Sequence, residues 1–237
     1  MATFVIRVWL PDRPGALGQV ASRIGAVRGD VVGIDILERD GGQAVDELVV
    51  ELPDDEVIDL LVAEVRQVDG VAVEEVRPLA DALHDPRLDA LEAAAQLVGA
   101  HTVDELLSSV VTHARRVVGA NWVAVASLGD EGPGGKPVLV ADAEAPSGGW
   151  LEAYLAGSRH AGGAKDVVWA PLPSSGLALV LGRNDMAYRA RERRQVAALA
   201  RVVDTRLREL DRGGDPDDDA EPGRGAEPRD PFGRPIA

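Results

Sequence analysis

The sequence contains no cysteine, and this absence excludes several kinds of chemistry. Disulfides, thiolate nucleophiles, thiolate zinc sites and chromophores attached through a thiol all need a cysteine sulfur. Long apolar runs are also missing, because no stretch approaches the roughly 20 residues that span a bilayer. The opening residues MATFVIRVWLPD lack the basic start and the cleavage site of a signal peptide. We therefore expect a cytoplasmic protein with no membrane partner.

Basic residues are scarce relative to acidic residues. The 237 residues include 25 Lys and Arg against 40 Asp and Glu, so the formal net charge is −15. Because nucleic-acid binders need a basic surface to contact phosphates, this balance argues against a nucleic-acid partner. Hydrophobic residues make up 46% of the chain, which is enough for the cores of two modest domains.

Strand and helix patterns alternate through the first third of the chain. The apolar stretches TFVIRVWL, VVGIDILER, AVDELVVEL and VAVEEVRPL predict four strands, and DGGQ predicts the hairpin turn between the second and third. Helical spacing predicts one helix from Leu17 to Val27, closed by Gly29. It predicts a second helix after Pro53, with this apolar face: Val57, Leu60, Leu61, Val65 and Val68. The resulting βαββαβ order predicts a ferredoxin-like α+β fold.

Both faces of this predicted sheet need cover. The first strand places Phe4, Ile6 and Val8 on one side and Val5 and Trp9 on the other. The two helices cover only one side. We expect the side with Trp9 to meet either the second domain or a second copy of the chain, and the second possibility predicts a homodimer.

The segment PDRPGALGQVASRIG, the following GDVVGIDILER and the βαββαβ order together resemble an ACT domain. The resemblance covers about the first third of the chain. ACT domains are small regulatory modules that often bind amino acids. The resemblance implies a ligand at an interface between two domains, against the loop that joins the first strand to the first helix.

Carried over to matching positions, the resemblance implies a role for each residue of that loop. Asp12 and Arg13 become polar contacts, and Gly15 permits close approach of the ligand. The amides of Ala16 and Leu17 meet a carboxylate, because a helix N-terminus favours anions. The competing interpretation is that Pro14 and Gly15 only end a strand and begin a helix.

Two positions depart from the pattern of the serine-binding members of the family. Those members carry asparagine in the loop and again early in the second strand, where this chain has Asp12 and Val31. An amide contact across the interface is therefore missing. Asp12 could pair with the ammonium group of an amino acid, and Val31 favours an apolar neighbour, so the resemblance leaves the side chain of the ligand open.

A new pattern begins at Leu88. An amphipathic helix is predicted with Leu88, Leu91, Ala95 and Val98 on its apolar face, and a capping box then opens a second helix. Strands, a short helix and a long closing helix follow. This order, with VDELLSSVVTHARRVVGANWVAVASL and ALVLGRN…RERRQVAALARVV, resembles a GAF-like sensory domain. The cyclic-nucleotide signature of that family is missing.

We predict four parts of the chain: an ACT-like domain at 1–79, a linker at 80–87, a GAF-like domain at 88–210, and a disordered acidic tail rich in proline and glycine at 211–237. None of the four histidines, His84, His101, His113 and His160, has the spacing of a metal pair, and no nucleophile, acid and base converge in the sequence. We therefore expect no enzyme activity, metal or cofactor.

The prediction is a non-catalytic regulatory protein whose ACT domain binds an amino acid or a similar small metabolite. The GAF-like domain would then mediate association with a protein partner or transmit the signal. The alternative is a ligand-free scaffold, in which both domains serve dimerisation and partner binding.

Overall fold

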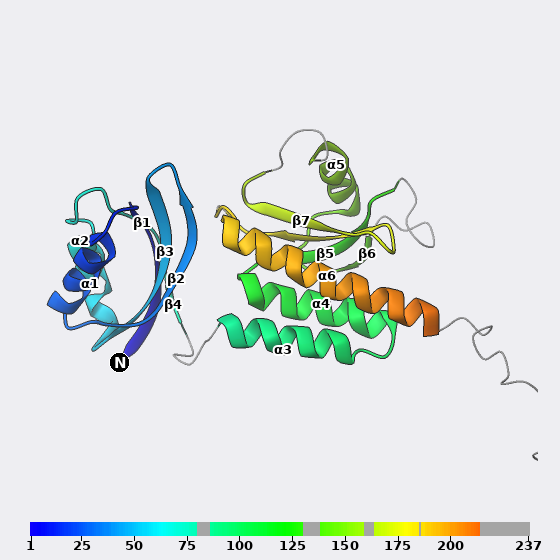
Figure 1. Cartoon of the computed structure of the whole chain (residues 1–237), viewed down its shortest axis with the longest axis horizontal. Coiled ribbons are helices and arrows are strands. Elements are labelled where there is room, and N and C mark those ends of the chain that lie inside the picture. Colours follow the sequence, from blue (N-terminus) through cyan, green and yellow to red (C-terminus); the bar gives the residue numbers. More distant parts are fainter. Residues whose placement is uncertain (80–85, 130–137, 159–163, 185, 214–237) are drawn as a thin grey trace, which may run out of the picture.

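The computed structural model of the protein describes residues 1–79, 86–129, 138–158, 164–184 and 186–213. They form two units, each built on its own four-stranded sheet (Figure 1). Most of the predicted linker and tail lies outside the described residues. Residues 86–87 already belong to a helix and the closing helix runs on to Gly213, so neither predicted boundary coincides with an element end.

The first unit has the predicted βαββαβ order. Its elements are β1 (Ala2–Pro11), α1 (Ala16–Ala26), β2 (Asp30–Asp40), β3 (Gln43–Leu52), the 3-10 turn η1 (Asp55–Val57), α2 (Ile58–Val65) and β4 (Ala72–Pro78). The sheet order is β2-β3-β1-β4, and all neighbouring strands are antiparallel. The ferredoxin-like prediction is confirmed.

Alternation along β1 separates the two faces of this sheet. Phe4, Ile6 and Val8 join the core with buried residues of α1 and α2. Two details of the helices differ from the prediction. Leu60 is 54% exposed, because consecutive helix positions are turned by about 100°, so that Leu61 and Val65 point inward and Leu60 points sideways. Arg28, and not Gly29, takes the left-handed conformation after α1.

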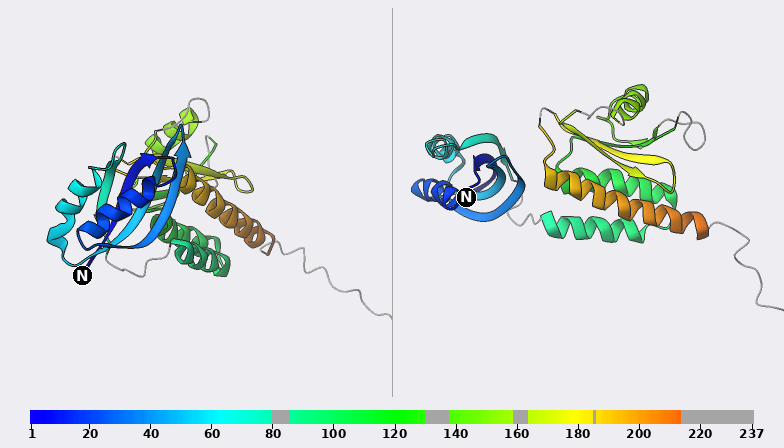
Figure 2. Two further views of the ribbon diagram at one scale, coloured as in Figure 1. Left: turned by 60° about the vertical axis from the view of Figure 1, so that its left-hand side comes forward. Right: turned by 45° about the horizontal axis from the view of Figure 1, so that its top comes forward.

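The second unit is an α/β domain. Its elements are α3 (Pro86–Gly99), α4 (Val103–Val118), β5 (Trp122–Ser127), β6 (Val138–Ala141), α5 (Gly148–Ser158), β7 (Val167–Leu172), β8 (Leu177–Gly182) and α6 (Ala190–Gly213). The sheet order is β6-β5-β8-β7. Helices α3, α4 and α6 lie on one side of the sheet and α5 on the other (Figure 2). Thr102 caps α4 as predicted, since its Oγ1 accepts from Glu105 N at 3.2 Å, while Glu105 Oε2 accepts from His101 N at 2.8 Å and not from the amide of Thr102.

The predicted apolar face of α3 is wrong. Leu88, Leu91 and Val98 are 51–68% exposed, and the buried residues of this helix are Ala93 and Leu97. Because α3 packs against both α4 and α6, the side with the small alanine allows close approach of the helices. The larger apolar side chains are left facing outward.

The open face of the first sheet is covered by the second domain. The N-terminal end of α6 points at this face (Figure 1), and the ring of Trp9 lies 4.6 Å from the guanidinium carbon of Arg189. Val5 is 3% exposed. Of the two predicted partners for this face, the second domain is therefore confirmed. The surface expected to support a homodimer is occupied within the chain.

No helix of the described residues is both long and apolar enough to cross a membrane.

Candidate functional site

The loop between β1 and α1 is shaped by Gly15. This residue has φ +87° and ψ −11°, a left-handed backbone conformation that residues with a Cβ atom rarely adopt. A Cβ at Gly15 would meet nothing within 4 Å, so the glycine is explained by backbone conformation and not by lack of space. This observation favours the competing interpretation of Gly15, and it leaves open space in front of the helix.

The other predicted loop residues are held by backbone hydrogen bonds. Asp12 N donates to Gly42 O at 2.9 Å, which ties the loop to the β2–β3 hairpin, and Arg13 N donates to Pro11 O at 2.8 Å. The amide of Ala16, predicted to meet a ligand, donates to Arg13 O at 3.3 Å. Ala16 is itself buried in the core, and Leu17 is half-buried at its edge. Backbone hydrogen bonds thus fix the path of the loop.

Asp12 forms an ion pair with Arg39 at the end of β2. Arg39 Nε lies 3.1 Å from both carboxylate oxygens, and Arg39 Nη2 also donates to Oδ1. Hydrogen bonds from Arg39 hold the pKa of Asp12 below its usual value. The sequence analysis missed Arg39, because residues 12 and 39 meet only through the β-hairpin that returns the chain to the loop.

A second carboxylate, Asp46, lies beside this pair and was also missed. It faces the helix-covered side of the sheet, in register with Val8 and Ile36, and is 3% exposed. No hydrogen-bond partner reaches Asp46 Oδ1 among the described residues. Burial raises the pKa of Asp46, Arg39 opposes this effect, and Asp12 adds to it. The sequence feature that could have revealed Asp46 is its charge at a strand position where the alternation calls for an apolar residue.

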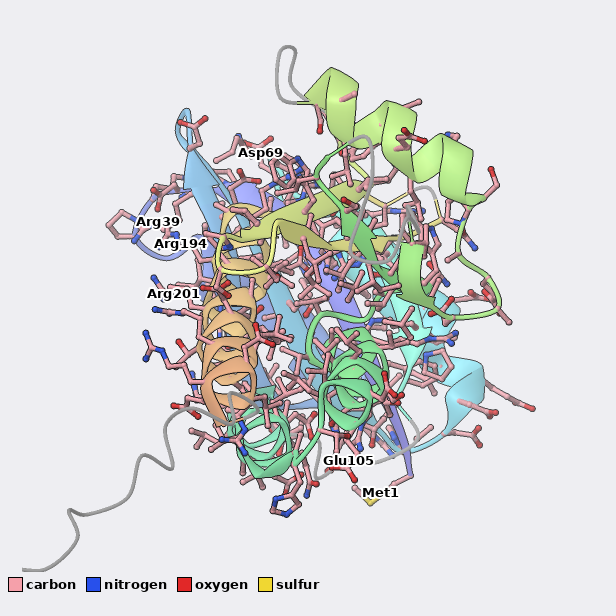
Figure 3. All side chains as sticks on the ribbon, turned by 90° about the vertical axis from the view of Figure 1, so that its right-hand side faces the viewer. Met1, Arg39, Asp69, Glu105, Arg194 and Arg201 are labelled. Carbon is pink, nitrogen blue, oxygen red and sulfur yellow. The ribbon has the colours of Figure 1, made fainter. Side chains whose placement is uncertain are left out.

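Val31 does not join the other predicted residues within one chain. It pairs in register with Val50, near the start of β1, whereas Asp12 follows the end of β1. At about 3.3 Å per residue, Val31 and Arg39 lie roughly 25 Å apart along β2. Figure 3 shows Arg39 and Met1 at opposite ends of this domain.

The outer strand β2 carries exposed apolar side chains next to the loop. Val32, Ile34 and Ile36 are 44–47% exposed, at alternate positions of an edge strand that pairs only with β3. Exposed apolar edge strands favour pairing with another chain. Among the described residues, no element covers this apolar edge of the first domain. It is not the surface around Val5 and Trp9 that the sequence suggested for a homodimer.

The other predicted candidates do not add to the site. His101 precedes α4 and His113 lies on it, while His84 and His160 are outside the described residues. The described residues contain no group of three or more His, Asp or Glu that could hold a metal ion.

Two clefts of the described residues lie away from the loop. One of about 830 Å³ is at the other end of β1, lined by Met1, Phe4 and Ile58 among others. The second, of about 480 Å³, lies between the domains and includes Arg7, Arg183 and Glu192. Neither includes any residue of the predicted loop. A ligand at the loop of a single chain would therefore remain largely exposed.

The topology of the first unit defines a domain of the ferredoxin-like class. Residues 4–70 match the family model of the ACT domain, so this part of the chain is an ACT domain. The resemblance noted in the sequence is confirmed for this domain. The match ends before the second domain, whose likeness to GAF domains stays a prediction.

Comparisons with other proteins give weak similarities. No curated protein matches the chain. The ACT domain of GTP pyrophosphokinase from Chlorobium tepidum is 20% identical, with 33% of this chain and 100% of that chain covered and a TM-score of 0.27. An unknown protein from Galdieria sulphuraria is 15% identical over 90% of this chain and 93% of that chain, with a TM-score of 0.32. TM-scores of this size indicate neither a shared function nor a shared ligand.

Proposed function

We propose that the protein is a regulator whose ACT domain binds an amino acid beside Asp12 and Arg39, at an interface between two copies of the chain. The observation that carries the proposal is the placement of this carboxylate–guanidinium pair next to the start of α1 and the exposed edge of β2. An ACT domain is a regulatory domain, and the family match supports that role.

The charges of the pair suit a zwitterion. The carboxylate of an amino acid can contact Arg39 and the free amides at the start of α1, while its ammonium group contacts Asp12. Both side chains are on the surface, where the existing ion pair contributes little stability and is readily exchanged for a ligand. The backbone hydrogen bonds of the loop keep the binding geometry in place.

A second copy would complete the site. Two β2 edges that pair antiparallel around a two-fold axis place the Asp12 end of one strand beside the Val31 end of the other. This pairing would cover Val32, Ile34 and Ile36. It would also bring together the predicted residues that one chain keeps apart, with Val31 as an apolar neighbour of the bound amino acid.

The first sheet also connects the site to the second domain. Strand β1 ends at the ligand loop and carries Trp9, which contacts Arg189. Strand β2 carries both Arg39 and Asp35, and Asp35 Oδ1 lies 2.5 Å from Arg191 Nη1 of α6. A shift of these strands on ligand binding would therefore move α6. The second domain then serves as the output of the regulator.

A thermal screen with each of the twenty amino acids tests the ligand. A compound that binds only the folded state raises the melting temperature. The decisive variants are Gly15→Asn and Gly15→Asp, because both side chains tolerate the left-handed conformation and differ in charge. We expect Asp to abolish binding of the amino acid found in the screen and Asn to retain most of it. Equal affinities would place the ligand elsewhere.

The ligand-free scaffold has two observations in its favour. The conformation of Gly15 and the Asp12–Arg39 ion pair account for the loop without any ligand. On this view no amino acid raises the melting temperature, and light scattering still shows a dimer. The two proposals therefore differ in the first measurement.

A further inference from the structure

The second cleft lies on the opposite face of the first sheet from α1 and α2. Its walls come from the open face of that sheet and, in the second domain, from the end of α4 and the start of α6. The volume of about 480 Å³ is within the range of sites for small molecules. The cleft is thus separate from the Asp12 loop, and both domains build it.

A buried chain of charges crosses between the domains here. Glu192 Oε1 of α6 lies 3.0 Å from Arg7 Nη2 of β1 and 2.6 Å from Arg183 Nη2, which follows β8. Arg7 Nη2 also contacts Glu47 Oε1 at 2.7 Å. One carboxylate oxygen therefore serves two guanidinium groups. Arg7 is 2% exposed and Arg183 is 5% exposed, so water does not screen them well.

This arrangement leaves donor groups without acceptors. Among the described residues, Arg7 Nη1 and Arg183 Nη1 are buried and have no hydrogen-bond partner. Buried polar groups in native proteins are nearly always paired, and an unpaired charged donor is costly. Glu75 Oε2, also in the lining, is likewise buried without a hydrogen-bond partner in the described part of the chain, so neither donor has an acceptor within reach although the cleft contains one. Two such donors, one from each domain, leave room for an acceptor that bridges them.

The cleft is lined by charged side chains of both signs. Its lining contains four carboxylates, from Asp35, Glu47, Glu75 and Glu192, and five guanidinium groups, from Arg7, Arg77, Arg116, Arg183 and Arg191. The fifth guanidinium group, that of Arg116, also lies 3.5 Å from Asp89 Oδ1, which is outside the lining, so the charges around the cleft nearly balance. Arg116 has a side chain that is 65% exposed, so it can attract an anion from solution toward the buried pair.

We propose that this interdomain cleft binds a small organic carboxylate, which supplies acceptors to Arg7 and Arg183. Planar carboxylates match the fork of a guanidinium group, and the charged walls exclude an apolar ligand. Because the two arginines belong to different domains, the bound carboxylate holds the ACT domain and α6 in the arrangement described here. The site is a second input to the protein, independent of the ACT loop.

Calorimetric titration of the full chain tests the proposal. Sodium acetate, succinate and phosphate serve as probes, with ionic strength held constant by sodium chloride. We expect saturable binding of succinate at one site per chain, and weaker or no binding of phosphate. Gln195 lines the cleft, and Gln195→Glu adds a negative charge with little change in size. This variant should bind succinate at least about tenfold more weakly.

Gln67→Glu is the matched control, since Gln67 is exposed after α2 in the first domain, does not line this cleft, and gives the same change in net charge. It should leave succinate affinity unchanged. Arg116→Gln changes an exposed position and should weaken succinate binding by roughly two- to fivefold. This variant still tests the proposal if Gln195→Glu does not fold. Asp12→Asn should have no effect, which separates this site from the ACT loop.

Several results would overturn the proposal. They are no saturable binding of either carboxylate at millimolar concentration, tighter binding of phosphate than of succinate, or equal weakening of succinate binding by Gln195→Glu and Gln67→Glu. Loss of succinate binding in Asp12→Asn would assign the binding to the ACT loop instead.

Discussion

Glu192 is the residue whose replacement tests the packing of the two domains most directly. Its carboxylate contacts Arg7 and Arg183, and its second oxygen accepts from Arg189 N at 2.7 Å at the start of α6. Glu192→Gln keeps the shape of the side chain but removes the negative charge between two buried guanidinium groups. Burial opposes the charge of Arg7, but Glu192 and Glu47 outweigh it and raise the pKa of Arg7.

Removing one partner of a buried ion pair typically costs about 3–5 kcal/mol. Glutamine can still accept a hydrogen bond, so we expect about 3 kcal/mol for Glu192→Gln, the lower end of that range. The assay is urea denaturation followed by tryptophan fluorescence, with separate fits if the domains unfold in two transitions. Glu209→Gln on the same helix is the control, because that side chain is 52% exposed and contacts only Arg206 among the ion pairs described.

The control should cost less than about 1 kcal/mol. The double variant Glu192→Gln/Arg7→Met should be destabilised by less than the sum of the two single changes. In Glu192→Gln the buried charge of Arg7 is left without its carboxylate, and the double variant no longer contains that charge. Two results would refute the reasoning that this buried charge network joins the domains. One is a decrease of less than about 1 kcal/mol in the free energy of unfolding for Glu192→Gln, and the other is a double variant whose destabilisation equals the sum of the two single changes.

Three further predictions concern the ACT domain. Gly15→Ala should lower the free energy of unfolding by about 1–2 kcal/mol and Gly15→Asn by less, measured by urea denaturation, because only the left-handed conformation is penalised. The raised pKa of Asp46 stabilises the fold fully below the unfolded value of about 3.9, and this contribution is lost as pH rises through the folded pKa. The melting temperature of Asp46→Asn minus that of wild type should therefore increase from acid to neutral pH. A difference that does not change with pH would contradict this. Ile34→Lys should convert a dimer to the 24.9 kDa monomer in light scattering without lowering the melting temperature of the monomer, whereas an unchanged dimer mass would exclude the β2 edge as the interface.

Local patterns were sufficient to predict the elements of both domains. The apolar alternation of β1, the two glycines of the β2–β3 turn and the Thr102 cap of α4 each act over a few residues. Their physical basis is backbone conformation and nearest-neighbour hydrogen bonding. The order of these elements, together with the loop around Gly15, was enough to identify the ACT domain.

Tertiary structure alone decided which surfaces are covered. The apolar stripe of Leu88, Leu91 and Val98 is as regular in sequence as any buried one, yet α3 packs through Ala93 and Leu97. The same limit applies to the candidate sites. Arg39 reaches Asp12 only because β2 returns beside the loop.

The contact of Arg7 with Glu192 joins residues 185 positions apart in the chain. The sequence by itself determined the fold of the ACT domain and the existence of a second domain, because these depend on short-range periodicity and turns. The charge network and the exposed edge of β2 depend on which long-range packing buries the most apolar surface, and no local pattern encodes that choice.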